Sequence, residues 1–129
     1  MADTLAAAKT ALYNLLAVDA SGRPKQSLTK VRRVYKGEPR AKEAEKPIAV
    51  TVASTRITDQ GFVVTVRVYA ATDTDPLAAQ DDLDETVDQI ETLLEADSTF
   101  RRGNWTIGYV EALEALVAAC DCEAFRPGF

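Results

Sequence analysis

The chain has 129 residues, a formal net charge of -5, a pI near 4.7 and no histidine. This length is typical of one domain that buries roughly two-thirds of its unfolded surface, and the acidic balance argues against a main task of gripping nucleic acid. The missing histidine removes the commonest general base and most zinc sites, and no apolar run is long enough to cross a membrane.

The first predicted element is an amphipathic helix over residues 5–17. Asp3 or Thr4 can cap its start, because both side chains accept hydrogen bonds from free backbone N–H groups. The apolar residues at helical spacing are Leu5, Ala8, Leu12, Leu15 and Leu16. Turn-forming residues over 19–24 end the helix, and a first strand is predicted over residues 27–35.

Residues 23–46 form a basic segment, with nine basic and three acidic residues and therefore a local charge of 9 − 3 = +6. Its second half, residues 36–47, is too polar to bury and too long for a tight turn, so we expect an exposed basic loop. The charge can be satisfied within one subunit, between neighbouring subunits or by an anionic partner. With Tyr35 as its one aromatic residue, the segment does not favour direct DNA binding.

A β-hairpin is predicted over residues 48–55 and 62–71, since apolar residues alternate in both runs and a turn sequence separates them. Phe62 and every second residue after it share one face of the second strand. Arg67 and Tyr69 project from the opposite face.

A long helix is predicted over residues 75–97, where Asp75 caps the start and Pro76 suits the first turn. A core-facing stripe contains Leu83, Val87, Ile90 and Leu94. One flank is acidic, and the other flank, with Asp82, Thr86, Gln89 and Leu93, is nearly neutral. The acidic flank is either a solvated surface or a face that must not bind its neighbour, and in the second case the neutral flank faces another subunit.

The C-terminal part begins with a predicted loop over residues 100–109, in which Trp105 is a buried anchor leading into extended structure. A short helical or irregular piece over residues 111–114 follows, and then a last strand to about Arg126; for residues 109–119 helix and strand both remain open. Cys120 and Cys122 fall on one face of that strand. They are expected to be small buried residues, since two cysteines without histidine are too few for a metal site.

Together these elements predict a single α+β domain over residues 1–129. Its antiparallel β-sheet has about four strands, with an N-terminal helix and one long helix packed on one face. No phosphate-binding or nucleophile motif is present, and carboxylates on a solvated flank are not poised for acid–base chemistry. We therefore predict no enzyme, no catalytic or metal-binding residue and no cofactor. An acid near the N-terminus also argues against a signal peptide, so we expect a soluble protein made in the cytoplasm, without membrane contact.

The order of elements, with PLAAQDDLDETVDQIETLLE after a β-rich run and GNW and LVAACDCEAFR behind it, resembles the tail terminator or tail completion proteins of long-tailed bacteriophages. The resemblance covers about residues 5–126. Members of that family are α+β subunits that typically form a six-membered ring, which caps the tail tube and joins it to the head connector. The resemblance implies a structural virion protein at the head–tail junction, with the tail tube protein and the connector as partners and genomic DNA passing through without specific binding. A neighbouring connector or stopper protein remains an alternative.

Two candidate surfaces follow if the chain forms such a ring. An acidic lumen lets DNA slide, because phosphates bind any row of Lys or Arg. The candidate lumen acids are Asp81, Asp84, Glu85, Asp88, Glu91 and Glu95. The candidate contacts with a neighbouring subunit or ring are Arg32, Arg33, Lys36, Arg40, Lys42 and Lys46. The alternative function is a small ligand-binding or regulatory domain whose open sheet face holds a metabolite through Arg67 and Tyr69.

Overall fold

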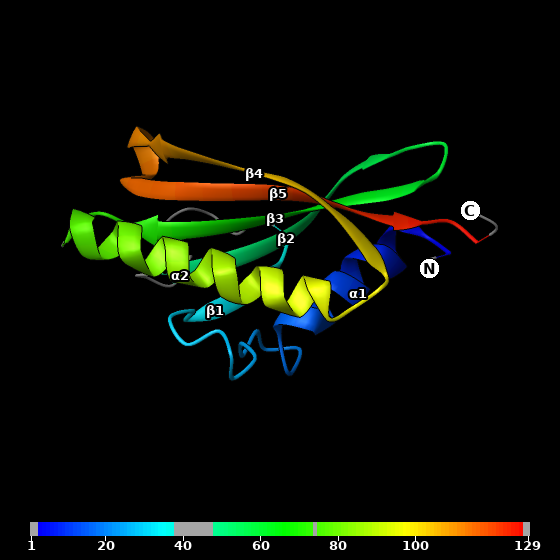
Figure 1. The fold of residues 1–129 in the computed structure, drawn as a ribbon, viewed down its shortest axis with the longest axis horizontal. Coiled ribbons are helices and arrows are strands. Elements are labelled where there is room, and N and C mark those ends of the chain that lie inside the picture. Colours follow the sequence, from blue (N-terminus) through cyan, green and yellow to red (C-terminus); the bar gives the residue numbers. More distant parts are fainter. Residues whose placement is uncertain (1–2, 38–47, 74, 128–129) are drawn as a thin grey trace.

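The computed structural model describes residues 3–37, 48–73 and 75–127, which form two α-helices, one 3-10 helix and a five-stranded sheet (Figure 1). The elements in chain order are α1 (Leu5–Leu16), β1 (Arg33–Lys36), β2 (Ile48–Ile57), β3 (Gly61–Ala71), α2 (Pro76–Glu95), β4 (Phe100–Val110), the 3-10 helix η2 (Glu111–Leu113) and β5 (Ala115–Phe125). The predicted short helical piece and the last strand are both confirmed.

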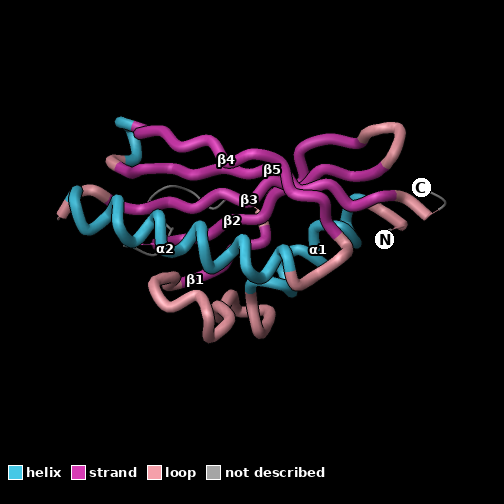
Figure 2. The backbone as a smooth tube through the Cα atoms, viewed as in Figure 1, coloured by secondary structure: helices cyan, strands magenta, loops and turns pink. Residues whose placement is uncertain are grey.

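The sheet has the strand order β1-β2-β3-β5-β4, which can be followed across the tube view in Figure 2. β1 runs parallel to β2, and the other neighbouring pairs are antiparallel. The predicted α+β class is confirmed. Two details differ from the prediction, because the sheet has five strands and one of its pairs is parallel.

The additional strand is β4, which the sequence predicts as a loop. It pairs with β5, and a shift of register between Arg102 and Trp105 accommodates Gly103 and Asn104. Cross-strand pairing here overrides the weak strand propensity of glycine and asparagine. β1 is shorter than the strand predicted over residues 27–35, because the chain before Arg33 forms turns.

Both helices pack on the same face of the sheet, as predicted. α1 begins where the side chain of Thr4 accepts the N–H of Ala7 at 3.0 Å, and it packs against β1, β2 and β3. α2 begins where Asp75 accepts the N–H of Ala78 at 3.1 Å, and it packs against β3 and β5. Neither of these helices is long and apolar enough to span a lipid bilayer, in the part of the chain that the structure describes.

The core lies between the helices and the sheet. The helix-facing residues of β3 are Phe62, Val64, Val66, Val68 and Ala70, and the buried residues of α2 are Ala79, Leu83, Thr86, Ile90 and Leu94. Full burial of one such Leu or Ile contributes about 2 kcal/mol. At 1.5 Å per residue α2 extends about 30 Å, so it covers most of the length of an 11-residue strand of about 36 Å.

One predicted member of the core stripe, Val87, is only partly buried, and Thr86 takes the central place. α2 is therefore rotated about its axis, so that the Thr86 side faces the sheet more than the apolar residues of the helix alone would predict. The reason lies outside α2, because a segment far away in sequence packs on the Thr86 side, as described below.

The two cysteines lie on the helix-facing side of β5. Cys120 and Cys122 are free thiols and both are buried, which confirms their predicted role as small buried residues. The hydrogen bond from Cys120 and the burial both raise the pKa of the Cys122 thiol. Cys122 is therefore not a thiolate nucleophile at neutral pH.

The end of the β2–β3 hairpin projects beyond the helices (Figure 1). Thr58 closes its turn, because its N–H donates to the carbonyl of Gly61 at 2.8 Å. Gly61 then passes close to β5, and a Cβ at this position would meet the carbonyl oxygen of Ala124 at 2.1 Å. Only glycine fits there without displacing one of the two strands.

Candidate functional site

The acidic flank of α2 is the first candidate surface. Among its predicted members, Asp81, Asp84, Glu85, Asp88 and Glu95 are exposed and Glu91 is half-buried. In the described chain, only Glu91 of this set has an ion pair, with 3.4 Å between its Oε1 and the Nη1 of Arg102. Asp84 accepts a hydrogen bond from the Gln80 amide at 3.0 Å. Most of the charge on this flank is therefore uncompensated.

This arrangement opposes helix stability. α2 contains four aspartates and three glutamates and no basic residue. Acids three or four residues apart on a helix repel each other, and each such pair costs roughly 0.2–0.5 kcal/mol. The acidic flank therefore reduces the stability of the helix. A surface with interspersed acidic and basic residues would keep the protein soluble without this repulsion.

The neutral flank of α2 is not free, so the prediction that it faces another subunit is wrong. Thr86 is fully buried, and its hydroxyl donates to the carbonyl of Asp82 at 2.7 Å. Gln89 forms two hydrogen bonds with Thr29. The Gln89 amide donates to the Thr29 hydroxyl at 3.0 Å, and the backbone N–H of Thr29 donates to the Gln89 carbonyl oxygen at 3.2 Å. Lys30 lies 3.8 Å from the Asp82 carboxylate. The turns that precede β1 thus cover this flank, and no local pattern in the sequence reveals a contact between residues 60 positions apart.

Two cations of the basic segment contact aromatic rings, and a third is exposed. The Arg33 guanidinium lies over the Tyr35 ring, 5.3 Å from its centroid. Lys36 lies over the Tyr13 ring at 5.0 Å and donates to the Thr10 hydroxyl at 3.3 Å. Arg32 is exposed. Three of the predicted contact residues lie outside the described residues: Arg40, Lys42 and Lys46.

Arg33 and Lys36 border a surface hollow of about 290 Å³ at the β1 edge of the sheet. Its lining consists of Tyr13, Ala20, Ser21, Arg33, Val34, Tyr35 and Lys36. A hollow with a guanidinium, an ammonium and no carboxylate in its lining suits an anionic group. The structure thus brings two of the predicted contact residues, Arg33 and Lys36, together at one site.

Comparison with known proteins adds no family to this geometry. No protein-family model matches the sequence, and no curated protein matches it significantly.

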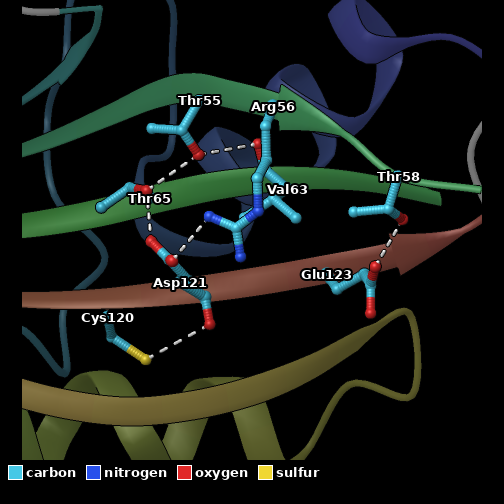
Figure 3. Close-up of polar contacts among 8 residues, drawn as sticks. All are labelled: Thr55, Arg56, Thr58, Val63, Thr65, Cys120, Asp121 and Glu123. Carbon is cyan, nitrogen blue, oxygen red and sulfur yellow. Dashed lines mark hydrogen bonds and ion pairs between the residues drawn. The ribbon is translucent and has the colours of Figure 1, made fainter.

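A polar network on the sheet face opposite the helices was not predicted (Figure 3). The Thr65 hydroxyl donates to Asp121 Oδ1 at 2.6 Å, and Arg56 Nη1 donates to Asp121 Oδ2 at 3.1 Å. The hydroxyl of Thr55 lies 3.1 Å from that of Thr65. The Thr65 hydrogen bond, and after it the interaction with Arg56, lower the pKa of Asp121 against the opposing effect of burial.

A second carboxylate, Glu123, extends this network along β5. It accepts from the Thr58 hydroxyl at 2.8 Å and from Arg101 at 3.3 Å. Both carboxylates border a hollow of about 140 Å³, lined by Arg56, Val63, Arg101, Arg102, Gly103, Asp121 and Glu123. Both carboxylates are already paired with donors, so they are suited to holding the hairpin on the sheet rather than to transferring protons. Among the described residues, no group of three or more metal-ligating side chains is placed to hold an ion.

The same sheet face carries the residues of the alternative ligand site. Arg67 and Tyr69 are half-buried, and each is engaged in an interaction with the rest of the protein. Arg67 stands opposite the buried Thr51 on β2. The structure therefore brings the two predicted ligand contacts together on one strand, but neither offers a free polar group.

The two edges of the sheet differ. At β1 the outer edge is covered, since the N–H of Val34 donates to the carbonyl of Gly22 at 2.8 Å. At β4, no described strand pairs with the outer side. Ile107 and Tyr109 on β4 are 54% and 55% exposed. Sequence reasoning missed this edge because it predicted a loop there, although the alternation of Trp105, Ile107 and Tyr109 is a strand signal.

Proposed function

We propose that the protein is a structural subunit of a bacteriophage tail, which assembles into a ring that caps the tail tube and joins it to the head connector. The observation that carries this proposal is the uncompensated acidic flank of α2. The repulsion among these acids lowers the stability of their own helix. The same acids would repel the phosphates of DNA, so that DNA could slide through a channel without binding to its wall.

A ring is needed because one subunit cannot surround a duplex. A compact chain of 129 residues has a radius of gyration of roughly 14 Å. Closed rings arise from heterologous contacts, in which one surface of a subunit meets a different surface of the next. α2 lies over β3 and β5 in the middle of the sheet, so contacts through the two sheet edges leave its acidic flank free to face a lumen.

The resemblance to tail terminator proteins supports the same assignment. The order of helix, hairpin, long acidic helix and closing strand agrees with an α+β subunit of that kind, and a ring of six subunits follows from the resemblance. Its partners are the tail tube protein and the head–tail connector protein, with genomic DNA passing through without specific binding. The protein resides in the virion at the head–tail junction and has no catalytic role.

The test of the lumen is a charge reversal on the acidic flank. The variant Asp81→Lys/Glu85→Lys/Asp88→Lys should bind duplex DNA with a steep salt dependence, because each new phosphate contact releases a counterion. The control Asp81→Asn/Glu85→Gln/Asp88→Asn removes the same carboxylates without adding cations and should not bind. If the lysine variant assembles with the tail tube protein but neither binds DNA nor slows its passage, the lumen assignment is wrong.

The test of the ring is its assembly state. Native mass spectrometry and negative-stain images should show closed rings of the full chain when the tail tube protein is present. Monomers alone under those conditions would contradict the proposal. The alternative of a metabolite-binding domain has weaker support, because Arg67 and Tyr69 are already engaged; thermal stabilisation by a small metabolite would favour it instead.

A further inference from the structure

β4 lacks the usual protection of an edge strand. Natural sheets cover or charge their edges to prevent uncontrolled pairing. β4 has 11 residues, and between Gly103 and Val110 it carries no charge and no proline. Its side chains Ile107 and Tyr109 are more than half exposed on the helix-facing side, and Val110 is 38% exposed. An edge of this length and polarity is suited to a protein partner.

An acidic tip, defined as Glu111 and Glu114, follows directly after this strand. Both residues are exposed, and neither carboxylate has an ion pair within the described chain. The tip is held in place at its base. Glu114 adopts a left-handed conformation with φ 47°, and its carbonyl accepts from both the N–H and the hydroxyl of Thr72 at 2.8 Å. The acidic tip is therefore presented by a fixed turn.

The opposite edge of the sheet carries the basic hollow, defined as the hollow of about 290 Å³ that Arg33 and Lys36 border. Exposed Arg32 lies next to it in the chain, and Val18, in the turn that covers β1, is 50% exposed. The nearby carboxylate of Asp19 is paired with Arg23 at 3.6 Å, and Lys36 in the lining of the hollow is exposed. Opposite charges, each beside an exposed apolar residue, thus occupy the two sheet edges.

The two surfaces also lie at the same level of the sheet. Strand pairing connects Arg33 to Ala49, Ala49 to Tyr69, Tyr69 to Val117 and Val117 to Gly108. The start of β1 and the end of β4 are thus the two ends of one row across the sheet, and in Figure 1 β1 lies below and β4 above the other three strands. A second copy displaced along this row brings its basic hollow towards the acidic tip of the first.

We propose that the β4 edge and acidic tip of one subunit dock on the basic hollow of the next copy of this chain. This inference rests on the proposed ring and names the surfaces that close it. The contact is heterologous, as a ring requires, and it leaves the acidic flank of α2 uncovered. Its opposed charges fix the orientation of the neighbour, and the apolar side chains of β4 supply buried area.

The experiment is a charge exchange between the two surfaces. The tip variant Glu111→Lys/Glu114→Lys and the hollow variant Arg33→Glu/Lys36→Glu should each assemble at least tenfold more weakly than the unchanged chain, measured by native mass spectrometry across a concentration series with the tail tube protein. Mixed in equal amounts they should assemble again, since alternating subunits match every contact in a ring with an even number of subunits. The control Asp3→Lys/Asp59→Lys makes the same charge change at exposed sites away from both edges and should assemble normally.

Circular dichroism and thermal unfolding establish that each variant folds. Since Lys36 contacts Tyr13 and Thr10, the tip variant and a second β4 variant, Tyr109→Asp, carry the test if the hollow variant unfolds. Three results overturn the proposal. Rings of unchanged affinity in both the tip variant and Tyr109→Asp exclude docking through the β4 edge and acidic tip, whereas rescue of the tip variant by Arg101→Glu/Arg102→Glu indicates two-fold pairing of β4 with β4. No ring from the unchanged chain, even with the tail tube protein, refutes the proposed function as well.

Discussion

Replacing Asp88 by lysine should stabilise the isolated subunit. Asp88 lies in the middle of the acidic flank and is exposed. Three of its four neighbours at helical spacing are acidic: Asp84 four residues before it, Glu85 three before it and Glu91 three after it. Lysine would reverse the sign of all three interactions, whereas most substitutions in a folded protein destabilise it.

The expected gain follows from the pairwise energies. Each like-charge pair costs roughly 0.2–0.5 kcal/mol, and each opposite pair contributes about the same amount with the other sign. Three reversed pairs give about 1–3 kcal/mol before screening. Glu91 is already paired with Arg102, and exposed charges are screened, so we expect about 1 kcal/mol at low ionic strength. In a domain of this size that corresponds to a rise of roughly 4 °C in Tm.

The assay is thermal or urea unfolding of Asp88→Lys and the unchanged chain at about 0.01 M and about 1 M salt, where the Debye length falls from about 30 Å to about 3 Å. The gain should be largest at low salt and nearly vanish at high salt. Asp88→Asn removes the repulsion without adding attraction and should gain about half as much, and Asp59→Lys, in the hairpin turn, should change little. A loss of stability in Asp88→Lys at low salt would refute the description of this flank as uncompensated.

Two further predictions concern the sheet. Gly61→Ala should destabilise the protein by about 1–3 kcal/mol in urea unfolding, because its Cβ would meet the Ala124 carbonyl, whereas Gly108→Ala, with open space around it, should be nearly neutral; equal effects would contradict the close approach. Thr65→Val removes the donor that lowers the Asp121 pKa, so that pKa should rise in an NMR titration. A lowered pKa stabilises the fold at pH values above the unfolded pKa, and this contribution is lost as the pH falls through the folded pKa. The variant should therefore be less stable than the unchanged chain by about 1 kcal/mol or less at neutral pH, and the two should be equally stable in acid. A Tm difference that persists in acid would point to lost packing.

Local patterns predicted much of this fold correctly. The caps at Thr4 and Asp75, the hairpin, the long helix and the strand after residue 114 all follow from signals within a few residues of one another. These features depend on backbone hydrogen bonding and on alternation, which the sequence displays directly. The acidic flank was predicted in the same way, since helical periodicity determines which acids share a side.

The features that sequence reasoning missed depend on distant contacts. β4 contains Gly103, Asn104 and Gly108, which lower its strand propensity, and it becomes a strand because β5 offers a partner along its length. The neutral flank is covered by hydrogen bonds between Gln89 and Thr29, and the Asp121 network joins three strands. Each is a tertiary pairing, for which periodicity contains no information.

The opposed charges of residues 23–46 and 75–97 could in principle neutralise each other within one subunit. In the described residues they meet once, through Lys30 and Asp82 at 3.8 Å, because the turns before β1 contact only one flank of α2. The exposed carboxylates of the acidic flank therefore face outward: Asp81, Asp84, Glu85, Asp88 and Glu95. In the proposed ring, salt then acts in two opposite directions, since it weakens attraction between the edges and also screens repulsion among the acidic flanks that converge on the lumen. The end of a tail tube would act as a scaffold that positions the subunits. Contacts with this scaffold do not depend on the charge of the lumen, so the ring would no longer rely on an attraction between edges that salt weakens.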